Sequence, residues 1–293
     1  MLTELLPSYR ARVESQLERR LSERTGLEPR LQEAMRYSLL NGGKRMRPAL
    51  VYLAARFCRG SLDQADSAAC AIEAIHSYSL VHDDLPAMDD DELRRGKPTC
   101  HIAFDEATAI LAGDALLTWS FELLSQPDNI GTAQIQLQMV QALARAAGDL
   151  GMVDGQAFDL NSVGKQLTLD QLKAMHSAKT GALINVSLEL GALSAEATDA
   201  EMAALRQYGT ALGLAFQIKD DLLDIEGDTA TLGKPQGSDQ ARNKPTYPAL
   251  VGAEQCRAWL IDLQQQAVTA LEPFGSRSQA LVALAQYVIE RDH

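Results

Sequence analysis

The sequence is poor in aromatic residues and in cysteines. Phe, Trp and Tyr make up only 5% of its 293 residues. Because strands favour aromatic and β-branched residues in alternation, this scarcity argues against a β-rich fold. The four cysteines form no CxxC pair, so neither a zinc site of that type nor a disulfide framework is indicated. We expect reduced, mostly buried thiols at Cys58, Cys70, Cys100 and Cys256.

An excess of positive charge is also missing, since the net charge is −12. Nucleic acid is therefore not an expected partner, because a phosphate backbone attracts Lys and Arg. The first 20 residues lack the apolar stretch of a signal peptide, and no long uncharged apolar run follows that would span a bilayer. We expect a cytoplasmic protein without stable membrane insertion.

Apolar residues recur at three- and four-residue spacing in much of the chain, which predicts amphipathic or buried helices. The clearest stretches are 31–40, 49–57, 68–80 and 205–223. No linker rich in Pro, Gly or Ser divides the chain. We therefore predict an all-α helical bundle with a single domain over 1–293. The longest irregular segment, 227–248, is expected to act as a lid, because long loops in compact domains are more often functional than inert.

Two aspartate clusters follow the most apolar predicted helices. The first spans 83–89 and begins with Asp83 and Asp84; the second holds Asp220, Asp221 and Asp224. The carboxylates within such a cluster repel one another unless a cation neutralises them, and Mg²⁺ prefers carboxylate oxygens as ligands. A single acidic run is more often a solvated helix end. Two runs at the ends of apolar helices instead indicate a cavity that holds a metal ion.

Basic residues stand close to both clusters in the sequence. Each alone is more often a surface charge, but Lys and Arg are also the residues that bind phosphate oxygens. Carboxylates for a metal and cations for phosphate, set among apolar helices, indicate a diphosphate with an apolar tail. The basic residues concerned are Lys44, Arg45, Arg47, Arg94, Arg95, Lys179 and Lys234.

Five motifs in one order resemble those of the trans-prenyltransferases, the family of farnesyl and geranylgeranyl diphosphate synthases. The resemblance covers nearly the whole chain. The motifs are GGKRMRP at 42–48, DDxxxxD at 83–89 followed by Arg94-Arg95-Gly96, GQxxD at 155–159, the pair Lys179-Thr180, and FQxxDDxxD at 216–224.

This resemblance implies an all-α bundle around a deep central cavity, usually as a homodimer, with isoprenoid diphosphates as substrates. It implies two Mg²⁺ ions at Asp83 and Asp89 and a third at Asp220. Isopentenyl diphosphate would be held by Lys44, Arg47, His76 and Arg95. The allylic diphosphate would be held by Arg94, Lys179 and Lys234, with Thr180 and Gln217 beside the allylic cation. The candidate catalytic set is Asp83, Asp84, Asp89, Lys179, Thr180, Gln217 and Asp220.

The implied reaction is the Mg²⁺-assisted, head-to-tail condensation of isopentenyl diphosphate with dimethylallyl or geranyl diphosphate. Tyr78 stands five residues before Asp83, about 7 Å along a helix, and an aromatic ring there would form a floor for the growing chain. By this resemblance we predict the C15 product, farnesyl diphosphate. Ser79 is small, so geranylgeranyl diphosphate or a longer product remains an alternative.

Two other classes of protein remain open. A non-catalytic subunit of a synthase tends to lose aspartates from one motif, whereas both motifs are intact here. A helical nucleotide pyrophosphohydrolase predicts Glu-rich metal motifs instead of Asp motifs. His76 also has two interpretations. A lone histidine on such a helix is usually a core residue, and the resemblance favours contact with substrate.

Overall fold

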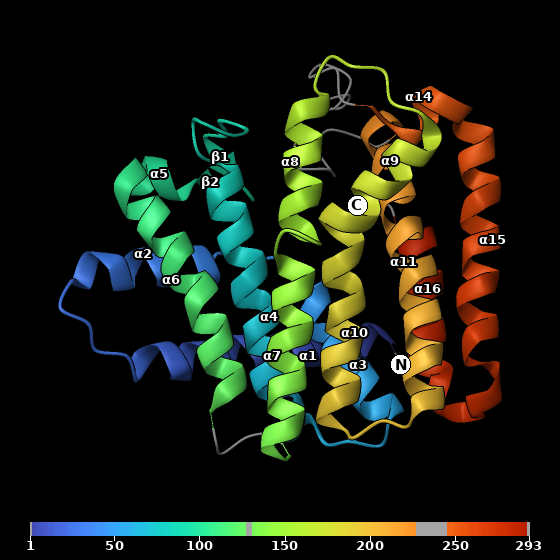
Figure 1. Ribbon diagram of the computed structural model, residues 1–293, viewed down its shortest axis with the longest axis horizontal. Helices are drawn as coiled ribbons and strands as arrows, with labels where there is room; N and C mark the ends of the chain where they lie inside the picture. Colours follow the sequence, from blue (N-terminus) through green and yellow to red (C-terminus); the bar gives the residue numbers. More distant parts are fainter. Residues whose placement is uncertain (1, 127–130, 227–244, 292–293) are drawn as a thin grey trace. The chain divides into compact units, whose positions relative to one another are not determined.

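The computed structural model describes residues 2–126, 131–226 and 245–291 (Figure 1). The predicted all-α fold is confirmed, since helices account for nearly all regular structure in the described residues. In chain order the elements begin with α1 (Leu2–Ser22), α2 (Pro29–Leu39), α3 (Met46–Phe57), α4 (Leu62–Asp83), β1 (Leu93–Arg94), β2 (Lys97–Pro98), α5 (Cys100–Ala103), α6 (Glu106–Ser125) and α7 (Ala133–Ala147).

The second half of the chain continues the helical pattern. Its elements are α8 (Met152–Ser162), α9 (Leu169–His176), the π-helix η1 (Ser177–Gly181), α10 (Ala182–Ser194), α11 (Asp199–Glu226), α14 (Tyr247–Val251), α15 (Ala253–Leu271), the 3-10 segment η2 (Glu272–Ser278) and α16 (Gln279–Glu290).

The described chain folds into two compact units. One is formed by Thr3–Gln141 with Leu190–Glu196, and the other by Ala142–Glu189 with Ala197–His293. The expectation of a single domain over 1–293 stays a prediction. Most of the segment expected to be a lid, residues 227–244, lies outside the described residues, and so does Lys234.

Helix α4 is a largely buried helix of the first unit. Ser61 caps its N-terminus in a capping box with Gln64, which satisfies backbone donors there. Ala, Ile and Cys side chains bury most of its surface against α3, α6 and α2. A helix that is apolar on most faces must lie inside a bundle. The first aspartate pair stands at the C-terminal end of this helix, so α4 delivers it from the interior of the unit.

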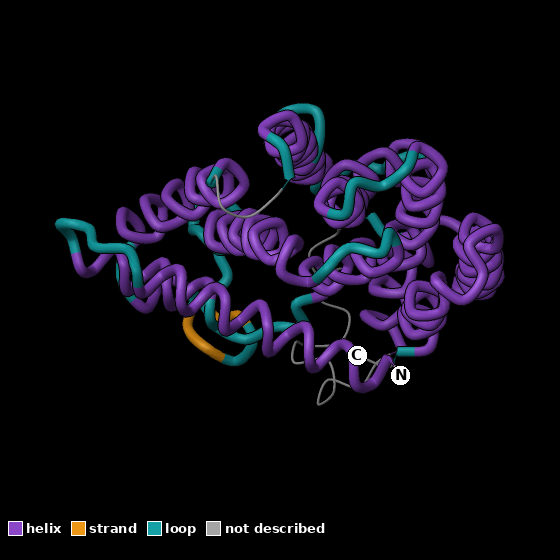
Figure 2. The backbone as a smooth tube through the Cα atoms, turned by 90° about the horizontal axis from the view of Figure 1, so that it is seen from below, coloured by secondary structure: helices purple, strands orange, loops and turns teal. Residues whose placement is uncertain are grey.

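A short hairpin departs from the expectation that the chain is helical nearly throughout. Strands β1 and β2 pair antiparallel, and they form the orange element of Figure 2. The turn between them is Arg95-Gly96, with φ of 55° and 75°. Positive φ at both central residues is the pattern of a type I′ turn, whose twist matches paired strands. The hairpin therefore positions Arg94 and Arg95, which are consecutive.

Helix α6 is the described helix that satisfies the length and composition of a membrane span, with 44% of that window buried. It packs against α4 and α2, and Asp105 caps its N-terminus by accepting from the Thr108 backbone N–H. Buried core helices of soluble proteins meet the same criteria, so this property is weak evidence for a span.

Helix α11 is the centre of the second unit. It packs against α15, α16, α14 and the π-helix η1 (Figure 1). Small residues permit the closest approach. A Cβ on Gly213 would lie 3.3 Å from the Gly181 Cα, so α11 and η1 are nearly in backbone contact. The second aspartate cluster lies on the last turns of α11, as the sequence predicts.

Candidate active site

The first aspartate motif begins on α4 and folds back on itself. The backbone N–H of Asp89 donates to the carbonyl oxygen of Asp83 at 2.9 Å. This bond closes the loop over 83–89, so the backbone of its last aspartate lies beside that of its first. Both residues are half-buried. The structure thus places the two residues close together, and their role as metal ligands stays a prediction.

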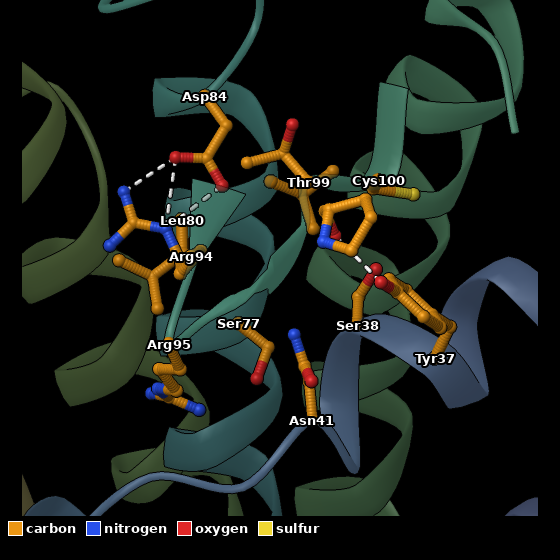
Figure 3. Close-up of a pocket in the computed structure, with 12 residues that line it drawn as sticks. Tyr37, Ser38, Asn41, Ser77, Leu80, Asp84, Arg94, Arg95, Thr99 and Cys100 are labelled. Atoms are coloured by element: carbon orange, nitrogen blue, oxygen red, sulfur yellow. Dashed lines mark hydrogen bonds and ion pairs between the residues drawn. The ribbon is translucent and has the colours of Figure 1, made fainter. Parts of the chain in front are cut away.

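Asp84 has a different environment from Asp83. Its side chain is almost fully buried, and it binds the guanidinium of Arg94 (Figure 3). Arg94 Nε donates to both Asp84 oxygens at 2.9 Å, and Nη2 donates to Oδ1 at 2.5 Å. Burial raises the pKa of Asp84, and the Arg94 hydrogen bonds oppose that rise. The pair therefore joins Asp84, from the candidate catalytic set, to Arg94, which was expected to hold the allylic diphosphate.

Arginines gather around His76 in the first unit. Arg47 Nη1 lies 3.2 Å from His76 Nε2. Burial, followed by the charges of Arg47, Arg95, Arg94 and Arg45, holds the pKa of His76 well below its usual range. The ring is therefore neutral at physiological pH. Because arginine can only donate, Nε2 must accept, and the ring proton resides on Nδ1. The cluster has the excess positive charge expected of a site for a diphosphate.

The loop with Gly42 and Gly43 fits closely around Arg95. Arg95 Nη1 donates to the Gly42 carbonyl oxygen. Gly43 has φ of +112°, and a Cβ there would lie 2.5 Å from the Arg95 guanidinium carbon. The backbone conformation therefore favours glycine, and a side chain at this position would also displace the Arg95 guanidinium. Lys44, the next residue, has an exposed side chain.

Arg45 belongs to the same motif but has a structural role that the sequence did not indicate. It is buried, with φ of 52°, and its Nη1 lies 2.5 Å from Glu73 Oε1. Its Nη2 donates to the Leu39 carbonyl oxygen at 2.8 Å. Arg45 thus ties the glycine loop to α4 and α2. A motif with several adjacent cations does not by itself reveal which one faces inward.

The second unit contains a cavity of about 140 Å³. Three motifs that are far apart in the sequence contribute to its wall: GQxxD, the Lys-Thr pair and FQxxDDxxD. The lining residues are Asp159, Met175, His176, Lys179, Thr180, Gln217, Asp221, Pro245 and Thr246. The structure thus brings together three of the predicted site residues, Lys179, Thr180 and Gln217.

Lys179 is held by an ion pair with the aspartate of the GQxxD motif. Its Nζ lies 2.6 Å from Asp159 Oδ2. The helices approach closely because Gly155 has no side chain, and a Cβ there would collide with the Lys179 backbone nitrogen. Lys179 itself lies in the π-helix η1, a local widening that is frequent at functional sites. The sequence predicted a helix here but not the π turn.

Hydrogen bonds connect the other cavity residues. Thr180 Oγ1 donates to Gln217 Oε1 at 3.3 Å, and Gln217 Nε2 donates to Asp221 Oδ1 at 2.9 Å. The backbone N–H of Tyr247, the first residue of α14, donates to Asp221 Oδ2 at 2.9 Å. Asp221 is buried and joins α11 to α14. Its role was not predicted from the sequence.

Asp220, the predicted metal ligand of this unit, contacts the C-terminal end of the described chain. Arg291 Nη2 lies 2.6 Å from Asp220 Oδ1, and the Arg291 guanidinium stacks 4.1 Å above the Phe216 ring. The Asp220 side chain is 43% exposed. Nothing in the sequence pattern indicated this contact, because Arg291 is separated from Asp220 by 71 positions. Asp224, four residues after Asp220, is buried.

His176 is a further cavity residue that the sequence did not single out. Burial lowers its pKa to about 4, so the ring is neutral at physiological pH. Among the described residues no hydrogen-bond partner contacts its buried Nδ1, and its ring centroid lies 5.2 Å from that of Tyr247. It stands one turn before Lys179, and that spacing is the signal that would have found it.

Tyr78, the predicted floor of the chain-length pocket, is a buried aromatic residue on α4. Its ring makes an edge contact with His82 at a centroid distance of 5.6 Å. Burial and the charge of Asp83 raise the pKa of Tyr78 to about 12. Ser79 is half-buried, and its hydroxyl donates to the His76 carbonyl oxygen at 2.9 Å. The role of this pair in product length stays a prediction.

The carboxylates of each motif suit a metal that has other ligands as well. Over 2–126, 131–226 and 245–291, no three Asp, Glu, His or Cys side chains gather into a preformed metal site. Mg²⁺ is commonly bound by one or two carboxylates, with waters and substrate phosphates completing its shell. The oxygen donors of Asp83, Asp89 and Asp220 fit this kind of site.

Comparison with known proteins decides the family. The polyprenyl synthetase family model matches residues 28–272. The chain belongs to the polyprenyl synthetase family. This membership confirms the resemblance drawn from the five motifs. It makes the protein a prenyltransferase, and it makes isoprenoid diphosphates the class of substrate.

Individual relatives agree with this assignment. Farnesyl diphosphate synthase of Haemophilus influenzae is 52% identical over 265 residues, which is 89% of this chain and 88% of the relative. Geranylgeranyl pyrophosphate synthase 11 of Arabidopsis thaliana, a chloroplastic protein, is 45% identical over 263 residues, 88% of this chain and 74% of the relative. The crystal structure of a geranyltransferase from Legionella pneumophila matches with a TM-score of 0.88 at 38% identity, covering 99% and 98% of the two chains.

Proposed function

We propose that this protein condenses isopentenyl diphosphate with dimethylallyl and geranyl diphosphate to give farnesyl diphosphate. The observation that carries the proposal is the convergence of the Lys179-Thr180 pair and of Gln217, from a separate motif, on one cavity of about 140 Å³. The 52% identity to a farnesyl diphosphate synthase supports the C15 product.

The two diphosphates have different binding groups in this proposal. The cluster of Arg47, neutral His76 and Arg95 binds isopentenyl diphosphate, with Lys44 at its edge. Arg94 and Lys179 bind the allylic diphosphate. Support comes from the pKa of His76, which burial and the surrounding arginines lower: the same positive charge that opposes protonation of the ring attracts a diphosphate.

We propose Mg²⁺ as the metal, with three ions when substrate is bound and with Asp83, Asp89 and Asp220 as protein ligands. The metal would neutralise the charge that develops on the leaving diphosphate. Lys179 adds a fixed cation, and the Asp159 ion pair keeps its ammonium group in place. Preorganised charges of this kind stabilise the transition state without reorganising during the reaction.

The remaining groups of the cavity protect and orient the allylic cation. Thr180 and Gln217 present polar oxygen atoms that favour positive charge nearby. After the alkene of isopentenyl diphosphate attacks, one proton must leave, and we assign its acceptance to the departing diphosphate. His176 is neutral, with a pKa of about 4, which makes it a weak base.

Homodimerisation and a cytoplasmic location are also proposed. The second copy would cover apolar side chains on α6 that are exposed in the single chain, among them Ile110 at 43% and Leu111 at 56%. Four buried free cysteines and the net charge of −12 suit a reducing, aqueous compartment. Light scattering coupled to gel filtration tests the dimer, since a dimer has twice the 31.8 kDa mass of the chain.

A longer product is the second candidate. Ser79 leaves a small side chain beside Tyr78, and a relative at 45% identity is a geranylgeranyl pyrophosphate synthase. Isopentenyl diphosphate carrying a radiolabel, dimethylallyl diphosphate and Mg²⁺ are incubated with the protein, and the products are separated by chain length. We expect a C15 diphosphate. A C20 product would favour the second candidate, and absence of any prenyl product from folded protein would refute both.

A further inference from the structure

We infer that Asp84 and Asp221 are positioning residues, Asp84 for the substrate-binding Arg94 and Asp221 for Gln217. This inference rests on the proposed function. The two units support it separately, through different partners.

In the first unit, the hydrogen-bond donors that face the Asp84 carboxylate come from Arg94. Both of its oxygens accept from Arg94, at distances between 2.5 and 2.9 Å, and its side chain is 4% exposed. Beside the pair lies a cavity of about 20 Å³, lined among others by Asn41, Ser77 and Thr99 (Figure 3). That volume holds about one water molecule.

Asp84 fixes Arg94 without using all of its donors. A guanidinium has five N–H groups, and here Nε and one N–H of Nη2 face Asp84. Three N–H groups remain, so Arg94 can bind a diphosphate while Asp84 holds it. The Arg94 side chain is 30% exposed, as a group that meets substrate must be. Asp84 therefore acts on the allylic diphosphate through Arg94.

In the second unit, both oxygens of Asp221 likewise accept hydrogen bonds from protein groups. Gln217 Nε2 donates to Oδ1 and the Tyr247 backbone N–H donates to Oδ2, both at 2.9 Å. The residue is 3% exposed, whereas the side chain of its neighbour Asp220 is 43% exposed. Consecutive residues of a helix point in directions about 100° apart. One aspartate of the pair therefore faces outward while the other faces the core.

Asp221 also decides which way the Gln217 amide points. An ionised carboxylate only accepts hydrogen bonds, so the NH₂ group of Gln217 must face Asp221. The amide oxygen then faces Thr180 and accepts its hydroxyl proton, at 3.3 Å. This leaves the lone pairs of the Thr180 oxygen for the allylic cation. If Asp221 did not accept, the amide would be free to turn, and Thr180 would lose its fixed orientation.

The test compares Asp84→Asn and Asp221→Asn with Asp83→Asn and Asp220→Asn. Each variant is assayed for its Mg²⁺ half-saturation, for kcat and for the KM of geranyl diphosphate. Binding of the unreactive geranyl thiolodiphosphate is measured by calorimetry with Mg²⁺ present. Thermal unfolding checks that each variant is folded, and Asp84→Glu and Asp221→Glu serve as second variants where an Asn variant does not fold.

We expect Asp84→Asn to weaken analogue binding and raise KM by about 10- to 100-fold, because charge-assisted hydrogen bonds to Arg94 are lost. The Mg²⁺ half-saturation should change by less than about three-fold, whereas Asp83→Asn and Asp220→Asn should raise it well beyond that. Asp221→Asn should lower kcat with the same small effect on Mg²⁺. A Mg²⁺ shift in Asp84→Asn or Asp221→Asn as large as that of its neighbour would overturn the inference.

A swapped pair tests the role of Asp221 directly. When Asp221→Asn is combined with Gln217→Glu, the amide introduced by the first substitution donates to the carboxylate introduced by the second. That carboxylate still accepts from Thr180, and the net charge is unchanged. This double variant should recover activity relative to Asp221→Asn alone; no recovery would contradict the orientation argument. Wild-type protein is assayed first, since a wild type that forms no prenyl product would refute the proposed function itself.

Discussion

Lys179 Nζ lies 2.6 Å from Asp159 Oδ2, although the two residues belong to different helices and are 20 positions apart. The approach depends on Gly155, one turn before Asp159, where a Cβ would collide with the Lys179 backbone. The GQxxD motif and the Lys-Thr pair therefore pack together as one part of the site. It holds a cation at the edge of a cavity.

Lys179→Met should lower kcat/KM by about 10²- to 10³-fold, because a preorganised charge near the leaving diphosphate is lost. The assay is the rate of farnesyl diphosphate formation at saturating Mg²⁺. Lys165→Met, at an exposed lysine of the same unit, is the matched control and should retain wild-type activity. Equal rates for the two variants would mean that Lys179 does not act on the substrate.

Tyr78→Ala should lengthen the product beyond C15, since removing a buried ring opens space one and a half turns below the aspartates. Chromatography of the prenyl alcohols after phosphatase treatment measures the product distribution. Tyr287→Ala on α16 removes the same volume in the other unit and should leave the product at C15. An unchanged product from Tyr78→Ala would exclude this ring as the floor.

His176 should make stability depend on pH in acid. Its pKa is about 4 in the folded protein, against an ordinary value of 6.5. Between pH 6.5 and 4 the unfolded chain therefore binds more protons than the folded one, and the free energy of unfolding falls as the pH falls. The contribution is at most about 1.4 kcal/mol per pH unit.

Urea unfolding of wild type and His176→Gln at several pH values measures this effect. The difference in unfolding free energy between the two proteins should change steadily from pH 6.5 to pH 4 in favour of the variant, and stay constant above pH 7. A difference that is independent of pH would show that the ring already takes up a proton in the folded state.

The buried pair of Arg45 and Glu73 should matter for stability more than exposed pairs do. Both side chains are nearly inaccessible, at 1% and 2%. Glu73→Ala leaves the Arg45 charge buried and should cost about 3–5 kcal/mol. Glu23→Ala removes one side of the exposed pair with Arg19 and should cost less than about 1 kcal/mol. Chemical denaturation measures both, and similar losses would contradict the account.

The sequence predicted the helices that carry the site with good accuracy. The apolar stretches 68–80 and 205–223 lie within α4 and α11, and both aspartate clusters stand near the C-terminal ends of these helices. Such helices can be predicted from the sequence because a buried helix needs apolar residues on most of its faces. The motifs were equally readable, because they consist of adjacent residues in fixed order.

Contacts between side chains that are far apart in the sequence could not be predicted. Nothing in the spacing indicated that Arg94 binds Asp84, that Arg291 reaches Asp220, or that Asp221 accepts from Tyr247. The Arg94 contact depends on the type I′ turn of the short hairpin. The other two contacts depend on how segments far apart in the sequence pack together. The π turn at Lys179 was also missed, because helical periodicity does not distinguish one widened turn from a regular one.

The central proposal is that both aspartate motifs hold Mg²⁺ ions that neutralise the leaving diphosphate. The decisive measurement is the rate of farnesyl diphosphate formation by Asp83→Asn, Asp220→Asn and the double variant. Groups that act as a unit are strongly non-additive, so each single variant should lose about 10²- to 10³-fold and the double variant little more. A single variant that keeps wild-type rates, or losses that simply multiply, would contradict the account.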